Sequence, residues 1–261
     1  MGGSGLKQSS DYENFYILFN KLPCEPFLIS TKLMTTMKKI FPVLFGFSLL
    51  LAACSKDNSP GGGTTTPNYQ PVTAGSTWTY ESTNKLTSAK SSYTLTATSG
   101  DSAINGKTYK IFTNSGGSND YYYNNGTEYY QFGGIAGITG NTELLYLKSN
   151  VAVASGWNET KTVTIPGLGT ANVKLGYTLV EKMANLTVEG VTYNDVMHVK
   201  VDLSDISVSG IPVTISSQDL HFYYAPNVGR VKSVIKLTLT PPIGSPIVTE
   251  SETNLKSYTI K

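Results

Sequence analysis

The fold class is decided by the stretch Tyr121-Tyr122-Tyr123-Asn124-Asn125-Gly126-Thr127-Glu128-Tyr129-Tyr130-Gln131-Phe132. Aromatic residues, which suit pleated strands, dominate both halves, and Asn124-Asn125-Gly126 between them has the chemistry of a hairpin turn. Asn105-Gly106 is a second turn of this kind, between Ala103-Ile104 and Thr108–Phe112. The sequence therefore predicts antiparallel strands joined by tight turns.

The same period-two pattern runs outward in both directions from this hairpin. Trp78 and Tyr80 alternate with Thr77 and Thr79, and no segment beyond Tyr69 shows an apolar period of 3.6 over helical length. The expected strands are Thr77–Ser82, Tyr93–Thr98, Ala103–Ile104, Thr108–Phe112, Tyr121–Tyr123, Glu128–Phe132, Glu143–Leu147, Thr160–Ile165, Val173–Glu181, Leu186–Val188, Val196–Leu203, Ile211–Ile215, Leu220–Tyr224, Arg230–Leu239 and Lys256–Ile260.

This spacing predicts an all-β fold with a single antiparallel curved sheet, a half-barrel or barrel-like, and leaves a sandwich as the alternative. A bulge is expected at Asn194-Asp195, and the three prolines of Pro241–Pro246 require a loop. Composition agrees, because 15% charged residues with 25 Gly and 17 Tyr argue against a helical bundle, a coiled coil or a charged disordered chain. With two Cys and two His, the sequence predicts no disulfide framework, no metal site and no cofactor.

Residues 37–54 have the pattern of a secretory signal, although they begin 36 residues after the first methionine. Lys38-Lys39 precedes an apolar run from Ile40 to Leu51, which ends in the small residues Ala52-Ala53 before Cys54. The run is shorter than the roughly 20 residues of a membrane-spanning helix. A buried core helix or an anchor helix is the alternative, and the lysine pair and small residues disfavour it.

Leu51-Ala52-Ala53-Cys54 resembles the lipobox of bacterial lipoproteins. The resemblance implies cleavage between Ala53 and Cys54 and attachment of diacylglycerol to the Cys54 thiol. Each buried methylene contributes about 0.8 kcal/mol, so two or three acyl chains would hold the protein on a membrane almost permanently. Lipid attachment at Cys54 is the most specific prediction that the sequence carries.

Four segments follow from this signal. We interpret residues 1–36 as an upstream stretch included because the start codon was assigned too early, with Met37 or Met34 as the true start; a real N-terminal extension is the alternative. Residues 37–53 are then the signal peptide, residues 54–68 a flexible tether, and residues 69–261 one all-β domain. Beyond Cys54 the acidic and basic side chains balance, and the only arginine is Arg230, so nucleic acid is not an expected partner.

Ser55-Lys56-Asp57, directly after Cys54, resembles the surface-export signals of Bacteroidetes lipoproteins. The resemblance implies an outer-membrane protein facing the cell surface. An ordinary spacer facing the periplasm is the alternative.

The domain also resembles a family of uncharacterised Bacteroidetes lipoproteins. Its first strand, Gly75-Ser76-Thr77-Trp78-Thr79-Tyr80, fits the G-x-x-W-x-Y start, and Tyr223–Lys232 fits the Y-x-A-x-x-V-G-x-V-K end. The resemblance implies a curved half-barrel like those of periplasmic lipoprotein carriers, and it implies no activity. We expect Trp78 and Val231 to be buried, and Gly229 to have a positive φ angle.

Candidate chemistry is sparse. His198 and His221 could each act as a base, but no catalytic motif accompanies them, so a structural or surface role is favoured. Asp202, Asp205 and Asp219 could gather around calcium, but their spacing matches no calcium loop and solvated strand ends are favoured.

Two surface features remain. Tyr121–Tyr123 with Tyr129-Tyr130 could stack on sugars, although cross-strand pairing within a sheet is the favoured interpretation. Asp101-Ser102-Ala103 matches the short O-glycosylation motif of Bacteroidetes, which makes Ser102 a candidate modification site.

Two function classes are predicted. The first is a non-enzymatic β-sheet module that binds an apolar ligand or glycan at the cell envelope, and the second is an accessory lipoprotein that engages an envelope protein. An enzyme is a distant third. A pocket wider than a methyl group would favour the first class, and a filled core with an exposed apolar patch would favour the second.

Overall fold

The computed structural model describes residues 67–135, 138–165 and 167–261, and the predictions made for residues 1–66 lie outside them. Thirteen strands make up the described part, which contains no helix. They are β1 (Thr77–Asn84), β2 (Lys90–Ile104), β3 (Lys107–Asn114), β4 (Asp120–Asn124), β5 (Glu128–Ile135), β6 (Ile138–Lys148), β7 (Gly156–Ile165), β8 (Gly169–Val188), β9 (Val191–Val208), β10 (Ile211–Pro212), β11 (Thr214–Ala225), β12 (Gly229–Thr240) and β13 (Ile247–Thr259).

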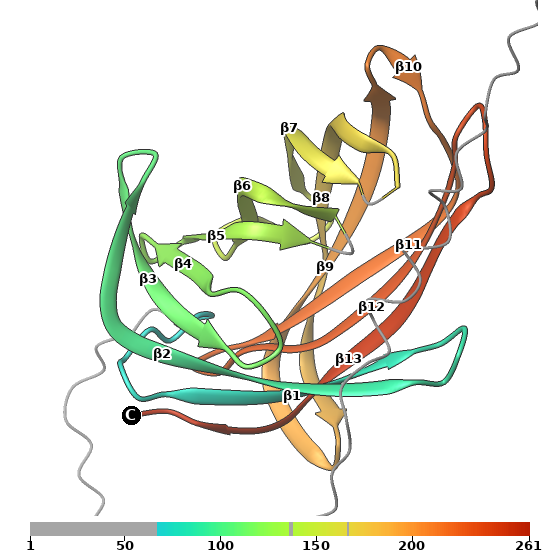
Figure 1. The fold of residues 1–261 in the computed structure, drawn as a ribbon. Coiled ribbons are helices and arrows are strands. Elements are labelled where there is room, and N and C mark those ends of the chain that lie inside the picture. Colours follow the sequence, from blue (N-terminus) through green and yellow to red (C-terminus); the bar gives the residue numbers. More distant parts are fainter. Residues whose placement is uncertain (1–66, 136–137, 166) are drawn as a thin grey trace, which may run out of the picture. The chain divides into compact units, whose positions relative to one another are not determined.

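All thirteen strands belong to one antiparallel sheet that curls into a barrel (Figure 1). The order is β10-β9-β11-β12-β13-β1-β2-β3-β4-β5-β6-β7-β8, and β8 pairs in turn with β9. The ring is thereby completed, and the short β10 is a side strand on β9. The predicted single curved antiparallel sheet is confirmed.

The predicted turns lie where the strands reverse. Asn105 and Gly106 have φ angles of 49° and 75°, and Gly126 has a φ of 96° between β4 and β5. The bulge predicted at Asn194-Asp195 was wrong: Asp195 has a positive φ of 54°, but the pairs Asn185↔Asn194 and Met183↔Val196 on either side of it keep one register. The register shifts of the β8–β9 ladder lie elsewhere, between Asn172 and Lys174 and between Leu179 and Glu181.

Some predicted boundaries were wrong. Tyr93–Thr98 and Ala103–Ile104 belong to one strand, β2, because a bulge between Ala97 and Asp101 absorbs the residues that the pattern suggested as a break. Val173–Glu181 and Leu186–Val188 are likewise parts of β8. The last strand begins at Ile247, well before the expected Lys256.

Alternation along the strands fills the barrel with aromatic and aliphatic side chains. Trp78 and Val231 are 1% and 0% exposed, as predicted, and they lie in one continuous core. Gly229 has the expected positive φ, 105°. Its neighbours Tyr69 and Gln70, from the segment that precedes β1, are buried there as well.

Because neighbouring strands are antiparallel, the connections alternate between two ends of the barrel. The segment Pro67–Gln70 enters at one end, where Asn227 N donates to Asn68 O (2.6 Å) at the β11–β12 turn. The β7–β8, β9–β10 and β12–β13 connections lie at the other end (Figure 1).

Pairing between neighbouring strands of the barrel is sparsest between β6 and β7, which share one Cα pair, Thr139↔Thr164. Side chains replace ladder bonds farther along. Leu145 N donates to Glu159 Oε2 (3.0 Å), and Trp157 Nε1 donates to Leu145 O (2.7 Å). Thr142 Oγ1 also donates to Thr162 O (2.9 Å), and these side-chain bonds hold the strands together where their backbones diverge.

Candidate functional site

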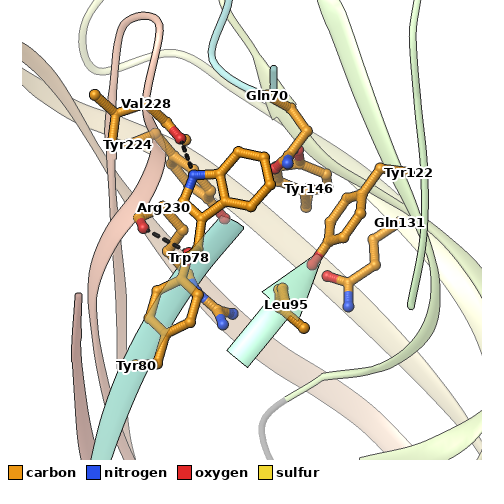
Figure 2. A pocket seen from close by; sticks show the side chains of 11 residues that line it. Gln70, Trp78, Tyr80, Leu95, Tyr122, Gln131, Tyr146, Tyr224, Val228 and Arg230 are labelled. Atoms are coloured by element: carbon orange, nitrogen blue, oxygen red, sulfur yellow. Dashed lines mark hydrogen bonds between the residues drawn. The ribbon is translucent and has the colours of Figure 1, made fainter. Parts of the chain in front are cut away.

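The barrel interior holds a polar pocket around Trp78, drawn in Figure 2. The indole Nε1 donates to Val228 O (2.7 Å), and the Tyr80 hydroxyl donates to Arg230 O (2.9 Å). Both bonds join β1 to the start of β12, which is the segment of the G-x-V-K pattern. The pocket is lined by Gln70, Trp78, Tyr80, Leu95, Tyr122, Gln131, Tyr146, Tyr224, Val228, Gly229 and Arg230.

Arg230, the only arginine in the chain, points its guanidinium into this pocket. Its Nη2 donates to the Tyr93 hydroxyl (3.0 Å), and its Cζ lies 5.3 Å from the centre of the Tyr80 ring. Tyr80 and Tyr93 are themselves stacked, with centroids 5.2 Å apart. The cation is therefore held by a hydroxyl and a ring face, and no carboxylate forms an ion pair with it within the described residues.

Burial governs ionisation around Arg230. It raises the pKa of Tyr80, Tyr122, Tyr146 and Tyr224 above the usual value, so these hydroxyls stay protonated at neutral pH. Burial also raises the pKa of Asp120, although Arg230 and hydrogen bonds from Asn114 and Gln131 oppose this effect. Tyrosines held protonated are hydrogen-bonding groups here, and none is poised as a nucleophile.

The pocket is small. About 20 Å³ is open to the centre of a water-sized sphere, which is room for roughly one water molecule. A sugar or an acyl chain does not fit such a space. The interior is therefore a filled core with a polar centre. It does not contain the cavity, wider than a methyl group, that would indicate a ligand bound inside the barrel.

The tyrosine-rich hairpin forms cross-strand pairs. Tyr123 lies opposite Tyr130 and Tyr121 opposite Phe132, with ring centroids 5.8 and 6.2 Å apart. Lys107 Nζ lies 4.5 Å from the centre of the Tyr130 ring. The rings therefore pair across the strands, as the favoured structural interpretation predicted, and Lys107 lies over the Tyr130 ring.

An apolar groove lies at the barrel end opposite Pro67. It offers about 190 Å³ to the centre of a water-sized sphere, and Ile243 and Ile211 beside it are 91% and 56% exposed. Sequence analysis assigned Pro241–Pro246 only as a loop and missed this surface. We call it the apolar groove; it is lined by Leu168, Val208, Ile211, Val213, Pro241, Pro242 and Ile243.

A third depression, of about 430 Å³, lies on β7, β8 and β9 and is polar. Gly156 and Gly176 line it together with Asn158, Lys174 and Asp202. The two aromatic residues beneath it, Trp157 and Tyr177, are 9% and 2% exposed and stack on each other. It therefore lacks an exposed ring for a sugar.

The two histidines of the chain lie against each other, which the sequence did not predict. His198 Nε2 is 2.7 Å from His221 Nδ1, and each outer nitrogen faces a carboxylate: His198 Nδ1 lies 3.1 Å from Glu181 Oε1, and His221 Nε2 lies 2.6 Å from Asp219 Oδ1. His198 also stacks on Tyr223 at 4.4 Å. Only the register of β9 against β11 brings them together, and local sequence carries no signal of it.

The other candidates remain apart. Asp202 pairs with Lys200 (2.8 Å) and Asp219 binds His221, while Ser204 Oγ lies 3.5 Å from Asp205. Across the described ranges, no group of three or more His, Cys, Asp or Glu residues is arranged to hold a metal ion. The calcium hypothesis therefore has no support from the geometry.

Ser102 lies in β2 opposite Tyr109, beside Asp101, which pairs with Lys110 (2.6 Å). Cys54 and Ala53 lie outside the described residues. In the part of the chain that the structure covers, no helix is long and apolar enough to cross a membrane.

Comparison with known proteins adds little. No family model matches the sequence, and no curated protein matches it. One similar solved structure is described as that of a "putative lipoprotein" from Parabacteroides distasonis, with 12% sequence identity, a TM-score of 0.46, and coverage of 74% of this chain and 99% of that one. A likeness this distant carries no argument about what this chain does.

Proposed function

We propose that the chain is an outer-membrane lipoprotein, anchored through acyl chains on Cys54, whose barrel is a non-enzymatic accessory module that engages an envelope protein. The lipobox-like Leu51-Ala52-Ala53-Cys54 and the apolar run before it support the anchor. The export-like Ser55-Lys56-Asp57 supports exposure at the cell surface.

The observation that carries the partner role is the apolar groove. The interior leaves room for about one water molecule, which argues against the form of the first function class in which an apolar ligand lies inside the barrel. The groove instead exposes contiguous apolar side chains, including Ile243 at 91%. Exposed apolar patches of this kind on soluble domains mark interaction sites.

The occupant that fits is an apolar side-chain cluster on a partner protein. No charged or sugar-stacking side chain lines the groove, which disfavours a glycan or a lipid headgroup. The chain enters the barrel at the opposite end, near Asn68 and Asn227, so the proposed tether joins the domain far from the groove. The groove end is thus free to meet another protein.

Photo-crosslinking in cells tests this proposal. A photoreactive amino acid at Ile243 of the full chain should give one discrete protein adduct, and Ile211→Asp in the same chain should abolish it, because a carboxylate in the groove opposes apolar burial. The same probe at Asn125, at the other end of the barrel, is the matched control. Adducts with lipid only, or equal adducts at both positions, would overturn the partner role.

A further inference from the structure

We propose that His198 and His221 share a single extra proton and form a pH-sensitive clasp at the base of a protruding arm of the barrel. The arm is the part of the β8–β9 hairpin between Val180 and Val196, where β9 no longer pairs with β11. The β9–β11 ladder runs only over Met197–Val201, so the clasp sits where the arm leaves the wall.

The proton count follows from the contacts. Glu181 and Asp219, when ionised, only accept hydrogen bonds, so the ring nitrogens that face them, His198 Nδ1 and His221 Nε2, must each carry a hydrogen. The contact of 2.7 Å between His198 Nε2 and His221 Nδ1 needs one hydrogen more. Three bonds therefore require three ring hydrogens, which is one imidazolium and one neutral imidazole.

Other proton counts break the chain of bonds. Two neutral rings supply two hydrogens, so one of the three contacts becomes a repulsion between lone pairs. Two imidazolium rings supply four, so two N–H groups meet at the centre and two positive charges lie with ring centroids 4.8 Å apart. The singly charged pair alone satisfies every contact.

The surroundings oppose a second charge on the pair, because their net effect is to lower the pKa of His198. Burial lowers the pKa of His198, the neighbouring His221 lowers it further, and Glu181 opposes both effects. Tyr223 covers the His198 ring, and burial raises its hydroxyl pKa, so it stays neutral. The remaining charges nearby are Lys200, paired with Asp202 on β9, and on β12 Lys232 and Lys236, which lie opposite Tyr223 and Asp219.

The arm beyond the clasp packs on the rest of the domain through Val188 and Tyr193, which are 4% and 5% exposed, and through a few polar contacts. Glu189 at its tip binds Lys256 (2.5 Å) and Asn254 (3.0 Å) of β13, and Tyr193 lies 6.3 Å from Tyr258 between ring centroids. The Tyr69 hydroxyl lies 3.5 Å from Asp195 O. Loss of the clasp removes the outer-face bonds at the arm's base and leaves these contacts to hold it.

Linkage gives the pH dependence its sign. Two unfolded histidines, with an ordinary pKa near 6.5, hold four ring hydrogens in acid and two in base. Below about pH 6.5 the unfolded chain binds more protons than the clasp, so stability falls as pH falls; above it the clasp binds more, so stability falls as pH rises. The contribution is therefore greatest near pH 6.5 and declines on both sides.

Nitrogen-15 NMR of the full chain in detergent, labelled only on histidine, tests the proton count directly. Because the chain has two histidines, four ring nitrogens are observed. At pH 6.5 we expect three protonated nitrogens and one bare nitrogen. Two bare nitrogens at that pH, or two rings that titrate independently with ordinary midpoints, would overturn the proposal without any substitution that risks the fold.

Stability and exchange then test the clasp. The difference in melting temperature between the native sequence and His221→Asn should peak near pH 6.5 and shrink at pH 5 and pH 8, whereas the difference for Lys200→Gln should not follow this curve. Protection factors of amides in 183–196 should fall at least threefold at pH 5 relative to pH 6.5, with β12 amides unchanged. A flat profile for His221→Asn would overturn the clasp.

Discussion

The indole of Trp78 reaches across the barrel to the backbone of Val228, 150 residues later, and binds its carbonyl oxygen at 2.7 Å. This bond joins the first strand to the turn that begins β12. Around it lie the rings of Phe112 and Tyr80, so the first and last thirds of the chain share one packed centre.

Trp78→Ala should destabilise the domain by about 3–5 kcal/mol, because it leaves a large cavity in a filled core. Trp78→Phe should cost less, about 1–3 kcal/mol, since the ring remains and the Val228 carbonyl loses its donor. Urea unfolding of the two variants measures both values. Equal stability of Trp78→Ala and the native protein would contradict the packing described for β1.

Substitutions at Gly229 test the cost of backbone strain alone, because an added side chain there would not collide with its neighbours. An added Cβ there meets no atom closer than 3.6 Å, but the φ of 105° strains any L-residue. Gly229→Val should therefore lose about 1–3 kcal/mol, and Gly229→Asn less, because Asn tolerates positive φ better than β-branched residues. Thermal melts distinguish the cases; a loss that scales with side-chain volume alone would point to packing.

A substitution at Gly156 tests the opposite case, in which an added side chain would collide with its neighbours but the backbone φ is not positive. A Cβ at this position would collide with the carbonyl oxygen of Tyr177 on β8. Gly156→Ala should cost about 1–3 kcal/mol or more, as overpacking does. Gly117→Ala is the matched control, because its Cβ would meet nothing within 4 Å; equal melting temperatures for the two variants would refute the close approach.

Glu252 should govern part of the acid sensitivity. Its hydrogen bond to Lys85 (2.9 Å), with further bonds to Asn254 and Lys232, lowers its pKa to about 2 against partial burial. The unfolded value is near 4.3, so the stabilisation is complete above about pH 5 and is lost as pH falls toward 2.

Glu252→Gln should therefore be less stable than the native protein at pH 7, and the gap should close as pH falls to about 2. Urea titrations at pH 7, 5 and 3 measure it. Glu250→Gln is the control, because that neighbouring carboxylate has no ion pair within the described residues. A gap that stays constant down to pH 2 would show that charge is not the cause.

Cys54→Ser should abolish lipid attachment, because serine offers no thiol for diacylglycerol transfer. The protein should then accumulate as an uncleaved precursor or leave the membrane fraction. Labelling cells with radioactive palmitate measures the modification. Label that still enters the Cys54→Ser protein would contradict the lipobox assignment.

Features that depend on a few neighbouring residues could be predicted from the sequence. Tight turns at Asn105-Gly106 and Gly126, burial of Trp78 and the positive φ of Gly229 each follow from a few neighbouring residues, and all four are confirmed. The break expected near Gly100 was wrong, because a bulge can absorb polar residues inside one continuous strand.

Long-range features were beyond this pattern. The contact between His198 and His221 depends on how β9 slides against β11, and the inward direction of Arg230 depends on the register shift between Tyr223 and Tyr224 beside it. The apolar groove gathers residues from three separate connections. Period and turn chemistry identify strands, but they do not fix which residues of distant strands meet.

The junction of β6 and β7 has a consequence for proteolysis. Most neighbouring strands are joined by several ladder pairs, whereas β6 and β7 share one Cα pair and are otherwise linked by side chains that include Thr142, Trp157 and Glu159. The loop 149–155 is therefore the main covalent link that keeps β6 beside β7. A protease that cleaves this loop would let the barrel open between these two strands.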